Sequence, residues 1–449
     1  MSKVFLIVPT RGNTPFATPH LGSAMMTASL KQAGHEVKVY DYAYLRGDER
    51  SWPALRTELE AFRPQLVGVS VYTSSVSAAL NIARQARELL HVPVVAGGPH
   101  TTLNPDRMIA QDCIDTVVVG DGEIVLPQIA ADPAKYAKQI VAGGQVEVKA
   151  LPMADFSSFY RHDRIRSYPL MTSRGCPFHC SFCTVHTVTS RKWRPREMDS
   201  VFAELDAAVA QFPKLLTIEV HDDCPTTDVK RFKQFLRGII DRRLNAALSV
   251  ANIRADTVDE ELVDLLIQAG SRSICIAAEH GNPQVFEFIG KSEKLEDIER
   301  AARIIKRKGA KLRLCFVIGL PKDNLTRIRD SIRLARKLNP SLIYWNMAHP
   351  FRHTRIREWY ETNGGTIRDD DDHSSYVEPS LTCDEPIVST PDFTAEQRKR
   401  AKFLCVVETD QYRLRDDGLR KLFSIAWNYG YTWAAVRSVA RKVLGLSYH

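Results

Sequence analysis

Short apolar segments alternate with longer helical segments along the first 350 residues, and this alternation constrains the fold more than any other feature. Between residues 1 and 140 the apolar segments fall at 4–8, 36–40, 66–71, 93–96 and 116–119. The first is a continuous apolar run, which is typical of a strand buried on both faces of a parallel sheet. The pattern predicts an α/β fold with a doubly wound, flavodoxin-like (Rossmann-like) domain at residues 1–140.

Glycine-rich and hydroxyl-rich turns follow the third, fourth and fifth of these strands. Such turns let a ligand approach the backbone closely and offer it amide groups. The carboxyl ends of the strands in a doubly wound sheet lie along one edge, where ligands bind. We therefore predict a ligand site that contains Ser70, Tyr72, Thr73, Gly97, Gly98, Pro99, Gly120 and Glu123.

Three closely spaced cysteines, Cys176, Cys180 and Cys183, follow a predicted strand at 168–173. Iron–sulfur clusters are normally held by four thiolates. A triplet without an evident fourth partner therefore indicates a [4Fe-4S] cluster with one iron open to a small molecule. A zinc site completed by His179 or His186 is the alternative, although zinc sites usually pair two short clips of ligands.

The cysteine segment resembles the radical S-adenosylmethionine (SAM) superfamily, in which the amino and carboxylate groups of SAM chelate the open iron. That resemblance implies a central partial (β/α)6 barrel of the TIM type at residues 168–365, with strands at 168–173, 215–220, 247–251, 273–278, 312–318 and 342–347. It also implies contacts with SAM at the carboxyl ends of these strands. The residues in the matching positions are Asp222 and Asp223 for the amino group, Arg254 for the carboxylate, Glu279 for the ribose and Ile318 for the adenine.

Residues 1–140 resemble the cobalamin-binding domain that precedes the barrel in one large subgroup of this superfamily. The resemblance includes Pro19-His-Leu-Gly22 and Ala33-Gly-His-Glu-Val37. Many cobalamin domains carry a cobalt-binding histidine in the loop after the first strand, and residues 9–18 contain none. This departure implies either a cobalt without a histidine ligand or a domain that has lost the cofactor. His20 and His100 are predicted to be structural or to donate a hydrogen bond to the corrin edge.

Two further segments lack a transferable motif. Residues 141–167 are predicted to be a linker with exposed aromatic side chains, and residues 366–449 a mainly helical domain or lid over the substrate face. Contact of the latter with an acidic partner or a membrane surface is the second interpretation. Residues 349–355 contain two histidines and two arginines, which indicate either an anionic-substrate pocket or a basic surface loop. The four aspartates at 369–372 are predicted to be solvated.

Composition argues against several other classes of protein. The 449 residues carry a net charge of +8, and the lysines and arginines form no recognisable nucleic-acid-binding module. The chain has no run of about 18 apolar residues and no cleavable N-terminal signal, so a cytoplasmic protein without a transmembrane segment is expected. The nine irregularly spaced cysteines indicate reduced thiols rather than a disulfide framework.

Together the two resemblances imply a cobalamin-dependent radical SAM enzyme with a [4Fe-4S] cluster, SAM and cobalamin. The expected reaction is methylation of an unactivated carbon of a small molecule or natural-product intermediate, with a flavodoxin or ferredoxin as electron donor. In the implied mechanism a 5′-deoxyadenosyl radical removes a hydrogen atom from the substrate, which then takes a methyl group from methylcobalamin. One alternative is a radical SAM reaction without methylation, such as rearrangement, cyclisation or transfer of another SAM fragment. Another is a cluster- or cobalamin-based sensor without turnover.

Overall fold

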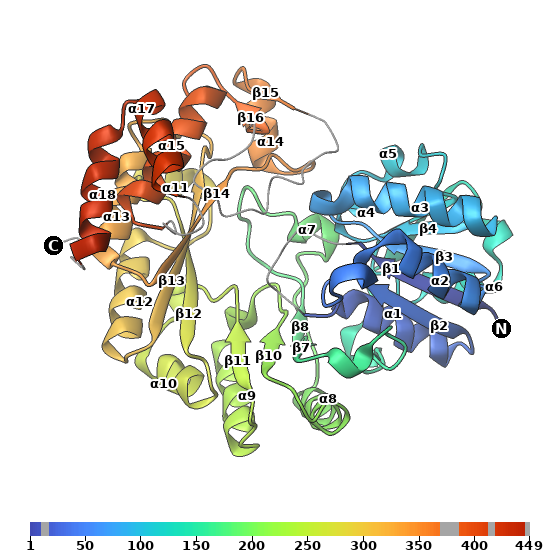
Figure 1. The fold of residues 1–449 in the computed structure, drawn as a ribbon. Coiled ribbons are helices and arrows are strands. Elements are labelled where there is room, and N and C mark those ends of the chain that lie inside the picture. The colour runs from blue at the N-terminus through green and yellow to red at the C-terminus, as the bar shows by residue number, and fades with distance from the viewer. Residues whose placement is uncertain (10–17, 369–385, 412–417, 445–449) are drawn as a thin grey trace.

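The N-terminal domain is built on a six-stranded parallel sheet with the order β2-β1-β3-β4-β5-β6. The computed structural model describes residues 1–9, 18–368, 386–411 and 418–444. The strands are β1 (Lys3–Val8), β2 (Glu36–Asp41), β3 (Leu66–Ser70), β4 (Val94–Gly97), β5 (Thr116–Gly120) and β6 (Gln139–Gly144). The helices are α1 (Leu21–Gln32), α2 (Trp52–Phe62), α3 (Val76–Leu90), α4 (Pro99–Leu103), α5 (Pro105–Ile109) and α6 (Val125–Ala131). Figure 1 shows this domain in blue, and its strand order confirms the predicted doubly wound fold.

The sixth strand, β6, was not predicted. It pairs in parallel with β5 and extends the sheet past residue 140, where the sequence analysis placed the domain boundary. Its sequence, Gln-Ile-Val-Ala-Gly-Gly, is short and ends in two glycines, and most of its residues are exposed at the sheet edge. A strand of this kind carries little of the apolar signal by which buried strands are recognised.

The interdomain segment, residues 145–166, buries aromatic side chains, so the prediction of exposed aromatics there is wrong. Phe156 and Phe159 are 0% and 2% exposed. The Phe156 ring packs edge-on against Tyr168 of the barrel, with 5.2 Å between ring centroids. Phe159 forms an isolated parallel bridge with Val39 of β2. The partner surfaces come from both domains, and the local sequence pattern carries no signal for them.

The central domain contains six parallel strands in two three-stranded sheets, ordered β11-β10-β7 and β12-β13-β14. They are β7 (Ser167–Leu170), β10 (Thr217–Val220), β11 (Ala247–Val250), β12 (Ser273–Glu279), β13 (Lys311–Ile318) and β14 (Leu342–Met347). A single bridge between Ile253 and Ile276 joins the two sheets, and within the described residues β7 does not pair with β14. This is the predicted partial (β/α)6 barrel, and it is open on one side.

Seven helices accompany the barrel strands along the chain, and Figure 1 shows α14 apart from the others, beside β15 and β16. They are α8 (Met198–Gln211), α9 (Val229–Asp241), α10 (Glu260–Gln268), α11 (Pro283–Ile289), α12 (Leu295–Arg307), α13 (Ile328–Leu338) and α14 (Arg355–Thr362). A short antiparallel hairpin of β8 (Ser173–Arg174) and β9 (Arg194–Pro195) encloses the cysteine segment and the one-turn helix α7 (Val185–Val188). The hairpin therefore fixes both ends of the loop that carries the three cysteines.

The C-terminal segment is mainly helical, as predicted, and its role as a lid over the substrate face stays a prediction. These helices are α15 (Ala395–Glu408), α17 (Leu419–Tyr429) and α18 (Thr432–Leu444), and a small sheet of β15 (Thr366–Ile367) and β16 (Val388–Ser389) precedes them. Helix α15 packs beside α13 against the edge strand β14 (Figure 1). The indole of Trp345 on β14 donates a 3.0 Å hydrogen bond to Thr409 just after α15 and stacks on Phe316. Lys402 of α15 also donates a hydrogen bond to the carbonyl of Trp345, so α15 closes this edge of the barrel.

Two sequence predictions fall outside the described residues. They concern the aspartates at 369–372 and most of the loop at 9–18 that lacks a histidine. Within the described ranges, no helix combines the length and the apolar character needed to cross a membrane.

Candidate active site between the two domains

The cysteine loop begins with a turn that requires glycine. Arg174 pairs with Arg194 in the β8–β9 hairpin, and Gly175 follows at φ +88°. Residues that have a side chain rarely adopt this left-handed region of backbone conformation. A Cβ atom at Gly175 would also lie 2.2 Å from the carbonyl oxygen of Lys192. The backbones at the two ends of the loop therefore approach each other so closely that only glycine fits at position 175.

Three partly buried thiols, those of Cys176, Cys180 and Cys183, form the donor set of this loop. Burial raises the pKa of Cys180 to about 12 and also raises the pKa of Cys183. A hydrogen bond between the thiols of Cys176 and Cys224 raises the pKa of Cys176 and lowers that of Cys224 to about 7. Because iron binds the thiolate form, cluster assembly must displace the thiol protons.

The donor set fits a four-iron cluster better than a zinc ion. Among the residues that the structure describes, no three His, Cys, Asp or Glu side chains are gathered as ligands of one metal ion. Zinc requires its ligands to converge within about 2.0–2.3 Å of a single atom. A four-iron cluster instead takes each thiolate at a different iron. His186, one of the two histidines considered for zinc, hydrogen-bonds to the backbone of His353 at 3.1 Å.

Asp222 and Asp223 support the cysteine loop. The Asp222 carboxylate is 2% exposed and accepts hydrogen bonds from the backbone and hydroxyl of Thr172 and from the hydroxyl of Ser173, each at 2.6 Å. Asp223 accepts a 2.7 Å hydrogen bond from the Gly175 amide. Burial raises the pKa of both carboxyl groups despite these donors. The contact of either with the amino group of SAM stays a prediction.

Arg254 fastens the cysteine loop to the barrel. Its guanidinium pairs with Asp256 at 2.7 Å and donates to the backbone carbonyl of Lys291 at 3.0 Å. The same group lies 3.7 Å from the ring centroid of Phe178, which is inside the loop. Such a cation–π contact is favourable when the cation is desolvated, and Arg254 is 5% exposed. Its predicted pairing with the carboxylate of SAM is untested.

Glu279 ends β12 in a strained conformation beside the loop. Its φ is +57°, and residues with side chains adopt that region mainly at turns and functional sites. Its carboxylate lies 3.4 Å from the Lys291 ammonium, which also reaches Glu293 at 3.2 Å. Ile318, at the end of β13, is fully buried. The predicted contacts of Glu279 with the ribose and of Ile318 with the adenine remain predictions.

A first cavity of about 340 Å³ lies at the carboxyl ends of β3, β4 and β5. Seven of the eight residues predicted to bind a ligand in this domain line it, namely Ser70, Tyr72, Gly97, Gly98, Pro99, Gly120 and Glu123. Most of the remaining wall is apolar, and Met171, Arg174 and His221 of the barrel domain close it. The volume and lining are those of a small-molecule or cofactor site.

The rim of this cavity is polar. The Nε2 atom of His20 lies 2.8 Å from the hydroxyl of Tyr72, and its Nδ1 accepts a hydrogen bond from the Ser23 amide at the start of α1. His20 therefore caps a helix, as a structural histidine would. Thr73, the eighth predicted residue, does not line the cavity, because its hydroxyl hydrogen-bonds to Nδ1 of His100 at 3.1 Å instead.

Replacing Gly98 with Ala is expected to weaken corrinoid binding about tenfold, because strained backbone costs roughly 1–3 kcal/mol. Gly98 has φ +105°, and a Cβ atom there would lie 2.9 Å from the carbonyl oxygen of Val71. Absorbance titration with hydroxocobalamin measures the affinity. Gly34→Ala is the matched control, since Gly34 also has positive φ but faces open space. Equal losses in both variants would contradict a specific role of Gly98.

A second cavity of about 460 Å³ adjoins the first. It lies where the carboxyl ends of β1 and β2 face those of β10 and β11, and its wall includes Asp41, Arg50 and Asp223. The two cavities share His20, Leu21, Gly22, Tyr72 and His221. A ligand in the first cavity and a ligand in the second would therefore be neighbours.

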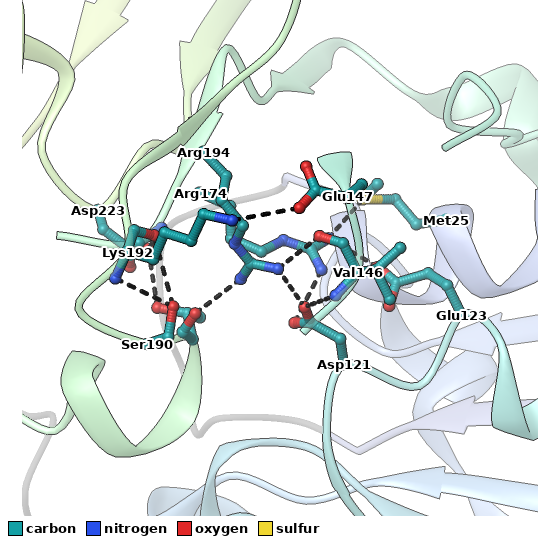
Figure 2. A network of polar contacts seen from close by, with 12 residues as sticks. Met25, Asp121, Glu123, Val146, Glu147, Arg174, Ser190, Lys192, Arg194 and Asp223 are labelled. Atoms are coloured by element: carbon teal, nitrogen blue, oxygen red, sulfur yellow. Dashed lines mark hydrogen bonds and ion pairs between the residues drawn. The ribbon is translucent and has the colours of Figure 1, made fainter. Parts of the chain in front are cut away.

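A buried ionic network joins the two domains beside the first cavity (Figure 2). Asp121 accepts hydrogen bonds from Arg174 at 2.9 Å and from Arg194 at 2.7 Å through its two carboxylate oxygens. Glu123 accepts a 2.7 Å hydrogen bond from Arg174, and Arg194 also donates to the carbonyl of Val146 at 2.6 Å. All four charged side chains are at most 11% exposed. The turn after β5 is thereby tied to both ends of the cysteine loop.

The basic segment at 349–355 contributes to a small cavity of about 30 Å³. His349, Phe351 and Arg352 line it together with His100 and Arg107 of the N-terminal domain. The segment therefore lies against the N-terminal domain. An anionic ligand at this place remains a prediction.

Two family models match the chain. The B12 binding domain model matches residues 8–130, and the Radical SAM superfamily model matches residues 170–335. The first segment lies within the six-stranded domain, and the second contains the cysteine loop. Fold and site thus define an enzyme of the radical SAM superfamily. More particularly, the chain combines a radical SAM domain with a B12-binding domain, and these two domains imply a [4Fe-4S] cluster, SAM and cobalamin as cofactors.

Similar curated proteins include methyltransferases and a cyclase. An uncharacterized methyltransferase of Pyrococcus horikoshii is 26% identical over 84% of this chain and 85% of its own length. The tryptophan 2-C-methyltransferase of Streptomyces laurentii is 24% identical over 76% of this chain and 71% of its own length. The anaerobic magnesium-protoporphyrin IX monomethyl ester cyclase of Rubrivivax gelatinosus is 24% identical over 73% of this chain and 64% of its own length.

Two solved structures share the fold. The radical SAM methyltransferase TsrM of Kitasatospora setae, with cobalamin and a [4Fe-4S] cluster bound, aligns with a TM-score of 0.68 at 21% identity, over 89% of this chain and 82% of that one. The cobalamin-dependent radical enzyme OxsB, with aqua-cobalamin and SAM bound, aligns with a TM-score of 0.63 at 19% identity. This alignment covers 80% of this chain and 55% of that one.

Five site residues were missed in the sequence analysis: Asp121, Arg174, Arg194, Lys291 and Glu293. Arg174 had a usable signal, because it stands two positions before the first cysteine. Asp121 had one too, since it lies in the predicted turn between Gly120 and Glu123. Lys291 and Glu293 had none, because they follow the short helix α11, which the sequence pattern did not predict.

Proposed function

We propose that this chain is a cobalamin-dependent methyltransferase that acts on an unactivated carbon of a small molecule. The observation that carries the proposal is the contact between the two cavities, which share five lining residues. A substrate in the second cavity lies next to the corrinoid site. It also borders Asp223, whose carboxylate holds the start of the cysteine loop. The relatives from Pyrococcus and Streptomyces, both named as methyltransferases, support this reaction.

When bound, the reduced cluster and SAM supply a radical that removes hydrogen from carbon, and cobalamin supplies a methyl group. The chain positions the reactants and excludes water from the mainly apolar first cavity. At the shared rim, Nε2 of His221 lies 3.5 Å from the carboxylate of Glu219. Although burial opposes it, hydrogen bonds from His221, Thr18 and Ser167 lower the pKa of Glu219. Glu219 therefore stays ionised beside His221 at this rim.

Cluster reduction requires an external electron donor, for which a flavodoxin or ferredoxin in the cytoplasm is the proposed source. The similarity to the Rubrivivax cyclase favours a second candidate function, in which the radical drives ring closure without methyl transfer. Both functions use the same cluster and SAM site. They differ in whether a methyl group passes through the corrinoid.

Labelled SAM separates the two candidates without knowledge of the substrate. The anaerobically reconstituted protein is reduced in the presence of SAM with a trideuterated methyl group, and the recovered corrinoid is analysed by mass spectrometry. We expect the label in the corrinoid and release of 5′-deoxyadenosine. Release of 5′-deoxyadenosine with an unlabelled corrinoid would contradict methylation and favour the second function. If the reduced protein released no 5′-deoxyadenosine, the result would favour a sensor without turnover.

A further inference from the structure

Glu123 has one carboxylate oxygen that no described residue satisfies. Its Oε1 atom accepts the 2.7 Å hydrogen bond from Arg174, whereas Oε2 is buried and has no hydrogen-bond partner in the described part of the chain. The residue is only 5% exposed, so bulk water does not replace the missing donor. Native structures seldom leave a buried carboxylate oxygen unsatisfied. The atom therefore indicates a ligand that carries a hydrogen-bond donor.

The first cavity is the space from which such a donor can come. Glu123 lines it together with residues such as Gly122, Met26 and Leu126, which offer no side-chain donor. A corrin ring carries amide side chains around its periphery, and an amide N–H is a good donor to a carboxylate. The chemistry of this wall therefore matches the edge of the cofactor that the B12-binding domain holds.

The same carboxylate is connected to the cluster side of the molecule. Arg174, which binds Oε1 of Glu123, also binds Asp121, and Asp121 binds Arg194 (Figure 2). Arg174 and Arg194 are paired across the hairpin that closes the cysteine loop. Asp121 thus binds the residues at both ends of that loop. Glu123 connects this network to the corrinoid cavity, because it binds Arg174 and lines the cavity.

We propose that Glu123 accepts a hydrogen bond from a peripheral amide of the bound corrin, and that Arg174 and Asp121 couple corrinoid binding to the cluster loop. In this arrangement the ordered cysteine loop holds the Arg174 guanidinium in position. Arg174 in turn orients the Glu123 carboxylate toward the corrin. The coupling is reciprocal by thermodynamic linkage, so a loaded cluster tightens corrinoid binding and a bound corrinoid stabilises the loop. The proposal rests on the corrinoid site of the proposed function, and it is independent of which group is transferred.

The test is an absorbance titration with hydroxocobalamin of the full chain, carried out with and without the reconstituted cluster. For the wild type we expect at least about fivefold tighter binding in the cluster-loaded form, the lower end of typical coupling. Glu123→Ala is expected to weaken binding about tenfold, as loss of a charge-assisted hydrogen bond does. Glu123→Gln keeps an oxygen for Arg174 and is the variant that guards against misfolding. It is expected to weaken binding as well.

Arg174→Met is expected to remove the difference between the two forms, with Arg174→Lys as the milder variant that retains part of it. Glu147→Ala is the matched control for the carboxylate. Glu147, in the interdomain segment, also pairs with the barrel domain, through Lys192 at 3.2 Å, but its side chain is 58% exposed and does not line the cavity. It should leave the affinity unchanged. Iron content and circular dichroism verify that each variant is loaded and folded.

Wild-type affinity in both Glu123 variants would overturn the contact, and an unchanged affinity ratio in the Arg174 variants would overturn the coupling. Either result leaves the methyltransferase proposal intact. Conversely, the expected titrations combined with an unlabelled corrinoid would overturn methylation alone. A wild-type protein that binds no corrinoid would overturn both.

Discussion

The triple substitution of Cys176, Cys180 and Cys183 by Ala is expected to reduce iron binding from about four irons per chain to about zero. The three thiolates are the predicted protein ligands of the cluster, so their removal should leave the irons unbound. Release of 5′-deoxyadenosine should disappear with the iron. Iron and sulfide analysis after anaerobic reconstitution, together with electron paramagnetic resonance of the reduced protein, measures the effect.

A cysteine far from the loop provides the control for this substitution. Cys113 is 1% exposed and lies in the core of the N-terminal domain, so Cys113→Ala should retain the full iron content. Corrinoid binding should survive in the triple variant, although more weakly if the two sites are coupled as proposed. Retention of four irons by the triple variant would disprove the cluster assignment.

Replacing Arg194 with Met is expected to lower the free energy of unfolding by about 3–5 kcal/mol, as loss of one partner from a buried ion pair does. Arg194 is 4% exposed and donates to Asp121, to the carbonyl of Val146 and to the carbonyl of Thr189. Its removal takes this donor from the carbonyls of Val146 and Thr189 and leaves Arg174 as the charged partner of Asp121 at the junction of the two domains. Urea denaturation measures the loss, and faster proteolysis within residues 145–166 should accompany it.

The exposed ion pair nearby supplies the comparison. Lys192 and Glu147 pair the barrel domain with the interdomain segment, but their side chains are 63% and 58% exposed. Lys192→Met should therefore cost only about 0–1 kcal/mol. A similar loss in both variants would show that position, rather than burial of the charge, sets the stability.

The features predictable from the sequence were those with strong local signals. The apolar run at 4–8 and the five that follow the cysteines predicted strands that the structure contains, because buried parallel strands have a nearly continuous apolar sequence. The cysteine spacing predicted the cluster for a similar reason, since the ligands lie within eight consecutive residues. The turns with Gly97 and Gly98 predicted the first cavity, because strand ends in a doubly wound sheet meet at one edge.

The features that escaped prediction depend on partners distant in sequence. From the local sequence alone, Phe156 and Phe159 cannot be distinguished from exposed loop aromatics, because the surfaces that bury them come from both domains. Asp121 and Arg194 form a pair across 73 positions, and no periodicity reports such a contact. The packing of the C-terminal helices escaped prediction for a similar reason, because a helical pattern does not show which surface the helix covers.

The interdomain segment has a consequence for association with other chains. Strand β2 is an edge strand, and edge strands present unpaired backbone groups to which another chain can add. The amide of Val39 on that edge donates to the carbonyl of Ser158, and its carbonyl accepts from the amide of Tyr160. The segment that docks the barrel thus also occupies this edge. Domain docking and protection against strand addition at β2 are therefore achieved by the same few residues.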